Sequence, residues 1–518
     1  MTRRDFLQRA GRFGSATFVS MTALGLLSRS TGRGAELQGL PSVQGKPGTR
    51  ILIIGAGIAG LTAAYELRKL GFTCTVLEAS HRVGGRSLTI RRGDTLTDTL
   101  GHTQTCEFDE GQYFNAGPAR FAPWQVTMDY CRELGVAVEP FIGTNDSAFY
   151  YNVDVPGALN GRRVRQRAAK ADLRGHTAEL LAKAVDQERL DQPFSTEDKE
   201  RLLDFLHREG DLQPGSHRYE GSTRAGFQTW PAVTTRGERD PAAEMLDLLQ
   251  ANFSAHLHRN NEYEYQPMLF QPVGGMDQLA LALYDRVKEV VRLGCEVREV
   301  RKTPQGARVV YSENGETHEE TADAAIVAVP PTILRKIPND FAGMVRNTIN
   351  VIPFQNSARI GLQFKRRFWE EDDQVYGGIT WTNQPINEIY YPSHDFFARK
   401  GVLIGYYMFG PASDQVTAIP PADRTEFALA QGEKIHPQYR AEFENAFSVN
   451  WNTVPHIQGC LSHFPEKLVR TLYPLLIKPD GPLYLAGDWA THLGGWQAGA
   501  FESARHVTRQ LHERVLAS

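Results

Sequence analysis

The most regular alternation of hydrophobic and polar positions lies near the start of the chain. Residues 50–54 form a fully apolar run of strand length, and residues 58–70 repeat apolar positions at helical spacing. Gly71 ends that helix, and residues 72–78 predict a second strand. Together these segments predict a β-α-β unit of about thirty residues, the opening of a nucleotide-binding fold.

The middle of the chain changes character. Residues 162–210 are charged and helix-periodic, and Ser195-Thr196-Glu197-Asp198 is similar to a capping box before a helix at 199–209. This pattern predicts an inserted helical domain. Strand patterns then return and a helix closes the chain: the predicted strands are 296–300, 307–311, 324–329 and 481–488, and the helix is 498–515.

Composition narrows the classes of protein that fit. The chain has 518 residues, which at about 150 residues per domain predicts roughly three domains. Hydrophobic residues make up 41% and charged residues 23%, values that exclude disordered, collagen-like and coiled-coil classes. The formal net charge of -3 gives no positive field for nucleic acid, so we expect no such partner. The five cysteines lie far apart without a C-x-x-C pair, so we expect neither a metal site nor a dense disulfide framework.

The first thirty residues have the pattern of an export signal. Thr2-Arg3-Arg4-Asp5-Phe6-Leu7 precedes a moderately apolar stretch at 13–27, as in twin-arginine signals. The apolar run is shorter than the roughly 18 residues that span a bilayer, so we expect no stable membrane anchor. The alternative is an exposed basic N-terminal helix, and the cleavage site stays open. Export of a folded protein to the periplasm or the medium is the prediction.

Gly55-Ala56-Gly57-Ile58-Ala59-Gly60 is a G-x-G-x-x-G motif between the first predicted strand and helix. Gly55 permits a tight turn, Gly57 lets a pyrophosphate approach the backbone, and Gly60 allows close helix-to-strand packing. Glu78 ends the second strand 18 residues after Gly60, where an acid accepts hydrogen bonds from a ribose diol. A plain glycine turn is the alternative, but the combined context predicts a dinucleotide site.

The next segment points to a flavin. Ala79-Ser80-His81-Arg82-Val83-Gly84-Gly85-Arg86 resembles the corresponding segment of glutathione-reductase-type FAD enzymes, in particular the amine oxidase branch. That resemblance implies a pyrophosphate contact from Arg86, an acid near the ribityl chain at Asp488, and an adenine contact at Val297. A solvated Arg86 and an ordinary strand valine are the alternatives. The residues expected to bind FAD are Gly55, Gly57, Ala59, Gly60, Glu78, Ala79, Gly85, Arg86, Val297, Gly487 and Asp488.

Four further segments resemble the L-amino acid oxidases: residues 111–120, residues 272–279, residues 389–392 with Tyr406, and residues 494–496. The resemblance implies that Arg120 binds the substrate carboxylate and that Tyr406 donates a second hydrogen bond to it. Such a clamp has a physical reason, because a buried carboxylate without a partner costs several kcal/mol. Surface pairing of Arg120 and core packing of Tyr406 are the alternatives.

The same resemblance implies two aromatic walls, Tyr390 and Trp496, and a carbonyl acceptor for the substrate amine at Gly495. Core packing is the alternative for each ring. Arg359 departs from the family pattern, because it falls where many flavin amine oxidases have a lysine that holds water near flavin N5. Because arginine cannot lose its proton, this difference leaves open how the enzyme reacts with oxygen, and so whether it is an oxidase or a monooxygenase. The alternative is that Arg359 pairs with an acid and has no direct catalytic role. Tyr407, Met408 and Cys460 are candidates for the side-chain end of the pocket.

The predicted function is oxidative deamination of L-amino acids by hydride transfer to FAD, giving 2-oxo acid, ammonia and hydrogen peroxide. The alternatives are a decarboxylating L-amino acid monooxygenase, an amine or polyamine oxidase, and a non-catalytic flavoprotein. The resembled enzymes are usually dimers, which implies a homodimer. The predicted fold class is α/β, a Rossmann-like FAD-binding domain with a mixed-sheet substrate domain and a helical insert. The predicted boundaries are 48–95, 268–345 and 470–518 for FAD binding, 96–155 and 346–469 for substrate binding, and 156–267 for the helical domain.

Overall fold

The computed structural model describes the chain from residue 46 onward, except residues 47, 190–193, 263–264, 463 and 518. The predicted signal at 1–30 therefore lies outside the described residues. None of the described helices is both long enough and apolar enough to cross a membrane.

A five-stranded parallel sheet forms the nucleotide-binding part, with strand order β13-β2-β1-β17-β25. The predicted β-α-β unit is confirmed as β1 (Arg50–Ile54), α3 (Ile58–Lys69) and β2 (Thr73–Glu78). The other strands are β13 (Val291–Leu293), β17 (Ala324–Val327) and β25 (Leu483–Leu485). Both faces of this sheet are covered, which explains why β1 is apolar at almost every position.

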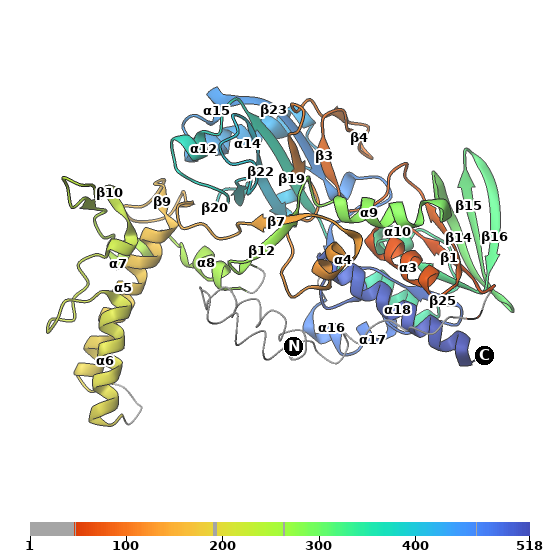
Figure 1. Cartoon of the computed structure of the whole chain (residues 1–518), viewed down its shortest axis with the longest axis horizontal. Helices are drawn as coiled ribbons and strands as arrows, with labels where there is room; N and C mark the ends of the chain where they lie inside the picture. Colours follow the sequence, from red (N-terminus) through yellow and green to blue (C-terminus); the bar gives the residue numbers. More distant parts are fainter. Residues whose placement is uncertain (1–45, 47, 190–193, 263–264, 463, 518) are drawn as a thin grey trace, which may run out of the picture.

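Alternate residues of β1 enter two different cores. Ile51 and Ile53 pack with α3, α9 (Gln278–Val287), α4 (Val126–Leu134) and α18 (Gln497–Ala517). Leu52 and Ile54 pack toward the antiparallel sheet of β14 (Cys295–Thr303), β15 (Gly306–Glu313) and β16 (Glu316–Ala322). Figure 1 shows this antiparallel sheet at one end of the molecule.

A second, seven-stranded mixed sheet has the order β23-β19-β22-β21-β20-β8-β9. Its strands are β8 (Phe149–Tyr151), β9 (Val164–Arg165), β19 (Ser357–Phe364), β20 (Ile379–Thr382), β21 (Glu388–Tyr390), β22 (Gly401–Phe409) and β23 (Phe443–Asn450). Helix α14 (Pro421–Ile435) packs against β22 and β23. Each face of the sheet belongs to its own apolar core, and every residue of β19 is buried.

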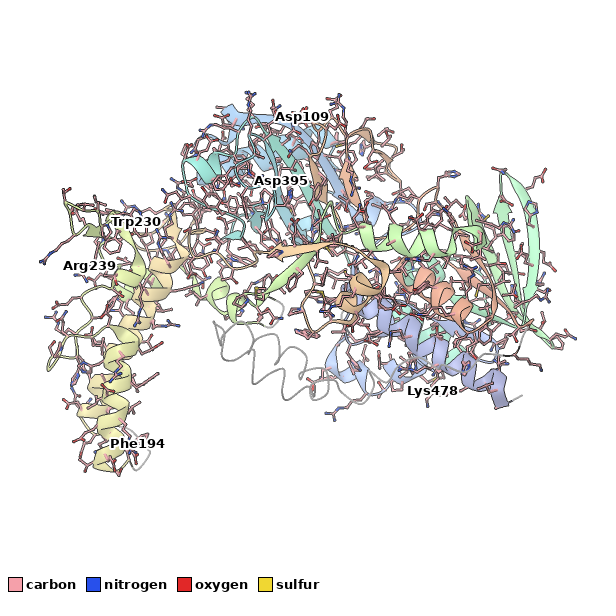
Figure 2. All side chains as sticks on the ribbon, viewed as in Figure 1. Asp109, Phe194, Trp230, Arg239, Asp395 and Lys478 are labelled. Carbon is pink, nitrogen blue, oxygen red and sulfur yellow. The ribbon has the colours of Figure 1, made fainter. Side chains whose placement is uncertain are left out.

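The helical insert forms an arm that projects from the rest of the molecule (Figure 1). Its long helices are α5 (Gln166–Asp186) and α6 (Thr196–Gly210). The predicted cap is present, because the Ser195 hydroxyl accepts a hydrogen bond from the Asp198 amide at 3.1 Å. Phe194 lies at the far end of the arm and Trp230 in its hairpin, as Figure 2 shows.

The remaining elements are short. The strands are β3 (Thr89–Arg91), β4 (Thr95–Thr97), β5 (Thr103–Thr105), β6 (Tyr113–Asn115), β7 (Val138–Phe141), β10 (Phe227–Thr229), β11 (Glu238–Arg239), β12 (Leu269–Pro272), β18 (Phe354–Gln355) and β24 (Leu461–Ser462). The helices are α7 (Met245–Gln250), α8 (Ser254–Leu257), α10 (Pro331–Leu334), α11 (Gly343–Val351), α12 (Phe368–Glu371), α13 (Pro411–Asp414), α15 (Tyr439–Glu442), α16 (Glu466–Val469) and α17 (Tyr473–Leu476). Helix α4 and the β7–β12 pair link segments from different predicted domains, and the domain boundaries stay a prediction.

Candidate active site

A long cavity of about 1050 Å³ opens beyond the carboxyl ends of the parallel strands. This is where open parallel sheets bind nucleotides, because the loops that follow the strands diverge there. All of the residues expected to bind FAD line this cavity except Gly60, which is buried behind the glycine loop.

The glycine loop is shaped as the motif predicts. A Cβ on Gly60 would lie 1.9 Å from the carbonyl oxygen of Gly55, so no side chain fits there. A Cβ on Gly57 would meet nothing within 4 Å, which leaves open space between the loop and the cavity. Helix α3 has no side-chain cap and no acidic residue in its first turn. Its positive N-terminal end is therefore available to a phosphate group.

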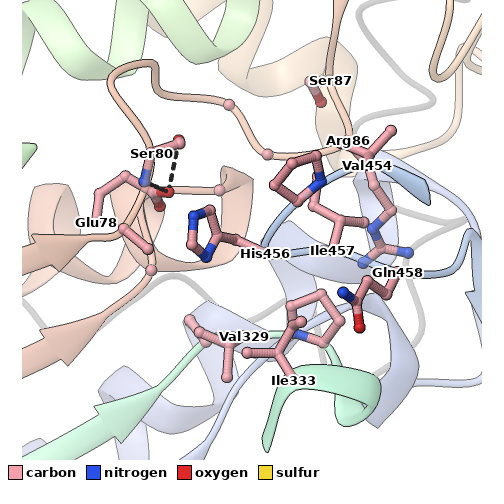
Figure 3. Close-up of a pocket in the computed structure, with 18 of the residues that line it drawn as sticks. Glu78, Ser80, Arg86, Ser87, Val329, Ile333, Val454, His456, Ile457 and Gln458 are labelled. Carbon is pink, nitrogen blue, oxygen red and sulfur yellow. Dashed lines mark hydrogen bonds between the residues drawn. The ribbon is translucent and has the colours of Figure 1, made fainter. Parts of the chain in front are cut away.

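Glu78 is held at the end of β2 by its neighbours. One carboxylate oxygen accepts a hydrogen bond from the Ala56 amide at 2.7 Å. The other accepts from the amide and the hydroxyl of Ser80 at 2.9 and 2.7 Å (Figure 3). An acid fixed at this edge of the cavity fits a ribose diol.

Arg86 and Asp488 form an ion pair across the cavity wall. Arg86 donates to both carboxylate oxygens of Asp488, one of them at 3.0 Å, and to the Cys460 carbonyl. Burial lowers the pKa of Arg86, but the Asp488 carboxylate outweighs burial and holds that pKa above its ordinary value. Asp488 also accepts a hydrogen bond from the Gly495 amide at 2.9 Å, so one acid orients both residues. The phosphate and ribityl contacts expected of this pair stay predictions.

A second cavity of about 500 Å³ adjoins the first, and we call it the chamber. The residues that line both cavities are Pro118, Tyr407, Leu461, Gly495 and Trp496. Two arginines, Arg120 and Arg359, line the chamber. A small molecule in the chamber would thus meet aromatic rings, two positive charges and the edge of the long cavity.

Arg120 lies between two aromatic rings. Its guanidinium carbon is 4.5 Å from the ring centre of Tyr265 and 5.2 Å from that of Trp496. Burial lowers the pKa of Arg120, but interactions with Tyr265, Tyr390 and Tyr407 outweigh burial and raise it. The side chain therefore presents a permanent charge to the chamber, as a carboxylate site requires.

Tyr390 packs behind the chamber wall and lines neither cavity, so the structure does not place it as the aromatic wall that the sequence predicts. Its ring meets that of Tyr407 at 5.7 Å and that of Phe141 at 6.4 Å. The Tyr390 hydroxyl is buried and makes no hydrogen bond within 3.5 Å in the described part of the chain, although the Glu388 carboxylate lies near enough to interact with it. It interacts electrostatically with Arg120. A buried hydroxyl without a short hydrogen bond beside the proposed clamp is a candidate donor to a bound carboxylate.

The expected place of Tyr406 in the site is wrong. Successive residues of a strand point to opposite faces, and Tyr406 belongs to the core on the far face of the seven-stranded sheet, near Phe427. Tyr407 lies on the near face and lines both cavities. Met408 is also buried in the far core, and Cys460 lines the long cavity and not the chamber, so neither lies at the side-chain end of the pocket as expected.

Arg359 does not pair with an acid, the alternative left open above. Among the described residues its hydrogen bonds go to the carbonyl oxygens of Asn115, at 2.9 Å, and Gly117. Its guanidinium carbon lies 3.6 Å from the ring centre of Tyr407. Arg359 is therefore a fixed cation in the chamber wall.

Two residues of the site were missed by the sequence analysis. Tyr265, from the helical insert, stacks on Arg120, and nothing in the local sequence marks it. Glu388 is 3% exposed and faces the same side of β21 as Tyr390. The sequence does offer a signal for Glu388, since it is a lone acid beside the apolar run 389–391. Within the described residues no cluster of three or more His, Cys, Asp or Glu side chains is arranged to hold a metal ion.

The fold and the two cavities define an FAD-dependent oxidoreductase. The open glycine loop, the free helix N-terminus and Glu78 fit the pyrophosphate and ribose of FAD, and the chamber meets the end of that cavity. The family model of flavin containing amine oxidoreductases matches residues 58–512, so the chain belongs to that family.

Named relatives agree with this class. The chain is 24% identical to an L-amino-acid oxidase of Pseudechis australis, over 89% of this chain and 86% of the relative. It is 26% identical to an L-amino acid oxidase of Crotalus durissus terrificus, with the same coverage. Among solved structures, putrescine oxidase bound to putrescine matches with a TM-score of 0.58 at 18% identity, over 92% of this chain and all of that one. The last likeness shows the fold alone.

Proposed function

We propose that the protein is an FAD-dependent L-amino acid oxidase. It converts an L-amino acid, oxygen and water into a 2-oxo acid, ammonia and hydrogen peroxide. The observation that carries this proposal is the charged Arg120 in an aromatic chamber beside the FAD cavity. A guanidinium can bind a carboxylate through two hydrogen bonds, and an α-amino acid carries a carboxylate whereas a simple amine does not.

Each residue around the chamber has one task in this proposal. Arg120 binds the substrate carboxylate, and the hydroxyl of Tyr390 donates a second hydrogen bond to it. The carbonyl of Gly495 accepts from the substrate amine, since this residue lines both cavities. The rings of Trp496 and Tyr407 exclude water and orient the Cα hydrogen toward the long cavity. When bound, FAD supplies the acceptor for that hydrogen and its electron pair.

A peroxide-coupled assay tests this function. The panel contains the twenty L-amino acids, their D-enantiomers and simple amines and diamines, with the purified FAD-loaded protein. We expect peroxide with at least one L-amino acid, none with its D-enantiomer, and a 2-oxo acid as product. An amide product would indicate the monooxygenase instead, and turnover of amines alone would indicate an amine oxidase.

Export and assembly complete the proposal. We infer that residues 1–30 direct the folded protein across the membrane by the twin-arginine route and that the mature protein is a homodimer. Replacing Arg3 and Arg4 with lysine should keep the enzyme in the cytoplasmic fraction of a host with this pathway. Sedimentation analysis of the purified protein should give twice the mass of one chain.

A further inference from the structure

Glu388 is a buried acid whose negative charge is only partly compensated. It lies on β21 and is 3% exposed. Its ion pair with Arg259 of η2 (His258–Asn261) is long, at 3.4 Å between Oε1 and Nη1, and the Arg259 side chain is 41% exposed. The second oxygen, Oε2, is buried and makes no hydrogen bond within 3.5 Å in the described part of the chain. A buried carboxylate is unfavourable unless close partners replace its lost hydration.

The charged and titratable groups that face Glu388 come from four different segments of the fold. They are Arg259 of η2, Tyr390 of β21, Arg359 of β19 and Arg120 of the segment between β6 and α4. Burial raises the pKa of Glu388, and its effect exceeds the opposing effect of these groups. The side chain therefore takes up a proton more readily than an exposed glutamate does.

Two of these four groups, Tyr390 and Arg120, are the ones that the proposed function assigns to the substrate carboxylate. The Tyr390 hydroxyl interacts with both Glu388 and Arg120. Residues 388 and 390 point to the same side of the strand, because side chains alternate along it. Glu388 lines neither cavity, so it acts on a bound substrate only through its neighbours. A substrate carboxylate would therefore draw on the same hydroxyl and the same cation as Glu388.

We propose that Glu388 competes with the substrate carboxylate for Tyr390 and Arg120, and takes up a proton from solvent when that carboxylate binds. Glu388 is thus a positioning residue for the substrate. A second negative charge nearby favours the neutral form of a carboxyl group, and the neutral form leaves both Tyr390 and Arg120 to the substrate. The coupling is reciprocal, so a proton on Glu388 also strengthens carboxylate binding. This role rests on the proposed function, because it takes Arg120 as the carboxylate site.

Benzoate tests this coupling without any turnover. It carries a carboxylate on an aromatic ring and has no amine to be oxidised. The FAD-loaded protein is titrated with benzoate by calorimetry in two buffers of different ionisation enthalpy, which gives the number of protons taken up. We expect the wild-type protein to take up protons on binding. Its affinity should fall as the pH rises from about 5 to 9, because the ionised Glu388 opposes a second anion.

Glu388→Gln removes the charge and keeps the size of the side chain. We expect this variant to lose the proton uptake and to bind benzoate about 5- to 150-fold more tightly than wild type at the high end of the pH range, the usual extent of coupling between two sites. If it does not retain FAD, Glu388→Met takes its place, because methionine has a similar volume and buries no charge. His492 also lines the chamber, and we expect proton uptake to persist in His492→Gln.

The matched control is Glu370→Gln. Glu370 is 4% exposed and is paired with Arg367 at 2.6 Å, but it lines neither of the two cavities. This variant should match the wild type in proton uptake and in its affinity for benzoate.

Proton uptake that persists in Glu388→Gln, or an affinity for benzoate that this variant does not increase, would overturn the proposal. Loss of the uptake in His492→Gln would overturn it as well. These outcomes leave the oxidase function intact, because that function is measured by peroxide formation in the wild-type protein. Wild-type protein that binds no benzoate would instead contradict the carboxylate site at Arg120, and this role with it.

Discussion

Two tyrosines on the seven-stranded sheet test the site, because both have buried hydroxyls that make no hydrogen bond within 3.5 Å in the described structure. Tyr390 lies on the chamber side, near Arg120, whereas Tyr406 lies in the far core. Replacing each by phenylalanine removes one oxygen atom and keeps the ring. The two variants therefore differ only in which face of the sheet loses its hydroxyl.

The magnitude follows from the hydrogen bond that is lost. A hydrogen bond to a charged group contributes about 1.5–3 kcal/mol, which corresponds to a 10- to 160-fold fall in kcat/KM at 1.36 kcal/mol per tenfold change. We expect this fall for Tyr390→Phe with L-amino acids, and no change for Tyr406→Phe. Each variant should change the free energy of unfolding by less than about 1 kcal/mol, because neither hydroxyl has a hydrogen bond within 3.5 Å in the substrate-free protein and only the weaker contacts with Glu388 and Ser448 are lost.

The assay is steady-state peroxide formation with the best substrate of the panel, together with thermal unfolding of the FAD-loaded protein. An unchanged kcat/KM in Tyr390→Phe would refute the proposed hydrogen bond to the carboxylate. A fall in kcat/KM in Tyr406→Phe alone would mean that Tyr406 faces the chamber. The register of β22 would then differ from the one described, and the role predicted for Tyr406 from the sequence would be right.

Two further predictions concern cofactor binding and pH. Gly60→Ala should abolish stable FAD binding, because the added carbon would lie 1.9 Å from the carbonyl oxygen of Gly55. The purified variant should show no flavin absorbance. A yellow, active variant would contradict this prediction. The second prediction concerns the buried pair Asp373 and His436. The pKa of Asp373 lies below its ordinary value, because His436 and nearby arginines such as Arg163 outweigh the effect of burial. The pKa of His436 also lies below its ordinary value, because burial disfavours its charged form. Both shifts make the free energy of unfolding decrease as the pH falls from about 7 to 4, since the unfolded chain binds more protons there. Asp373→Asn should therefore lower that free energy by about 3–5 kcal/mol at neutral pH and flatten its decrease in acid, which denaturant unfolding across pH measures.

The cofactor half of the site could be predicted from the sequence because its determinants are local. Gly55, Gly57 and Gly60 are fixed by backbone geometry at consecutive positions, and Glu78 by the end of the next strand. Such constraints are visible without tertiary contacts. Arg86 and Asp488 are far apart in the chain, but each stands in a motif tied to the same cofactor.

The substrate half was harder because its determinants are tertiary. Strand β22 is buried on both faces, so its apolar run does not alternate and gives no indication of which tyrosine faces the chamber. Tyr265 reaches Arg120 from the helical insert, a contact that no local pattern predicts. The partners of Arg359 are backbone carbonyls, which a sequence reading cannot identify.

The central claim is that Arg120 binds the carboxylate of the substrate. Its most direct test is anaerobic flavin reduction by a matched pair, an L-amino acid and the amine that lacks only its carboxylate, in wild-type protein and Arg120→Met. We expect the variant to lose about 2–5 kcal/mol, or 30- to 5,000-fold, in the second-order rate constant with the amino acid, and nothing with the amine. An equal effect on both compounds, or none on the amino acid, would contradict it.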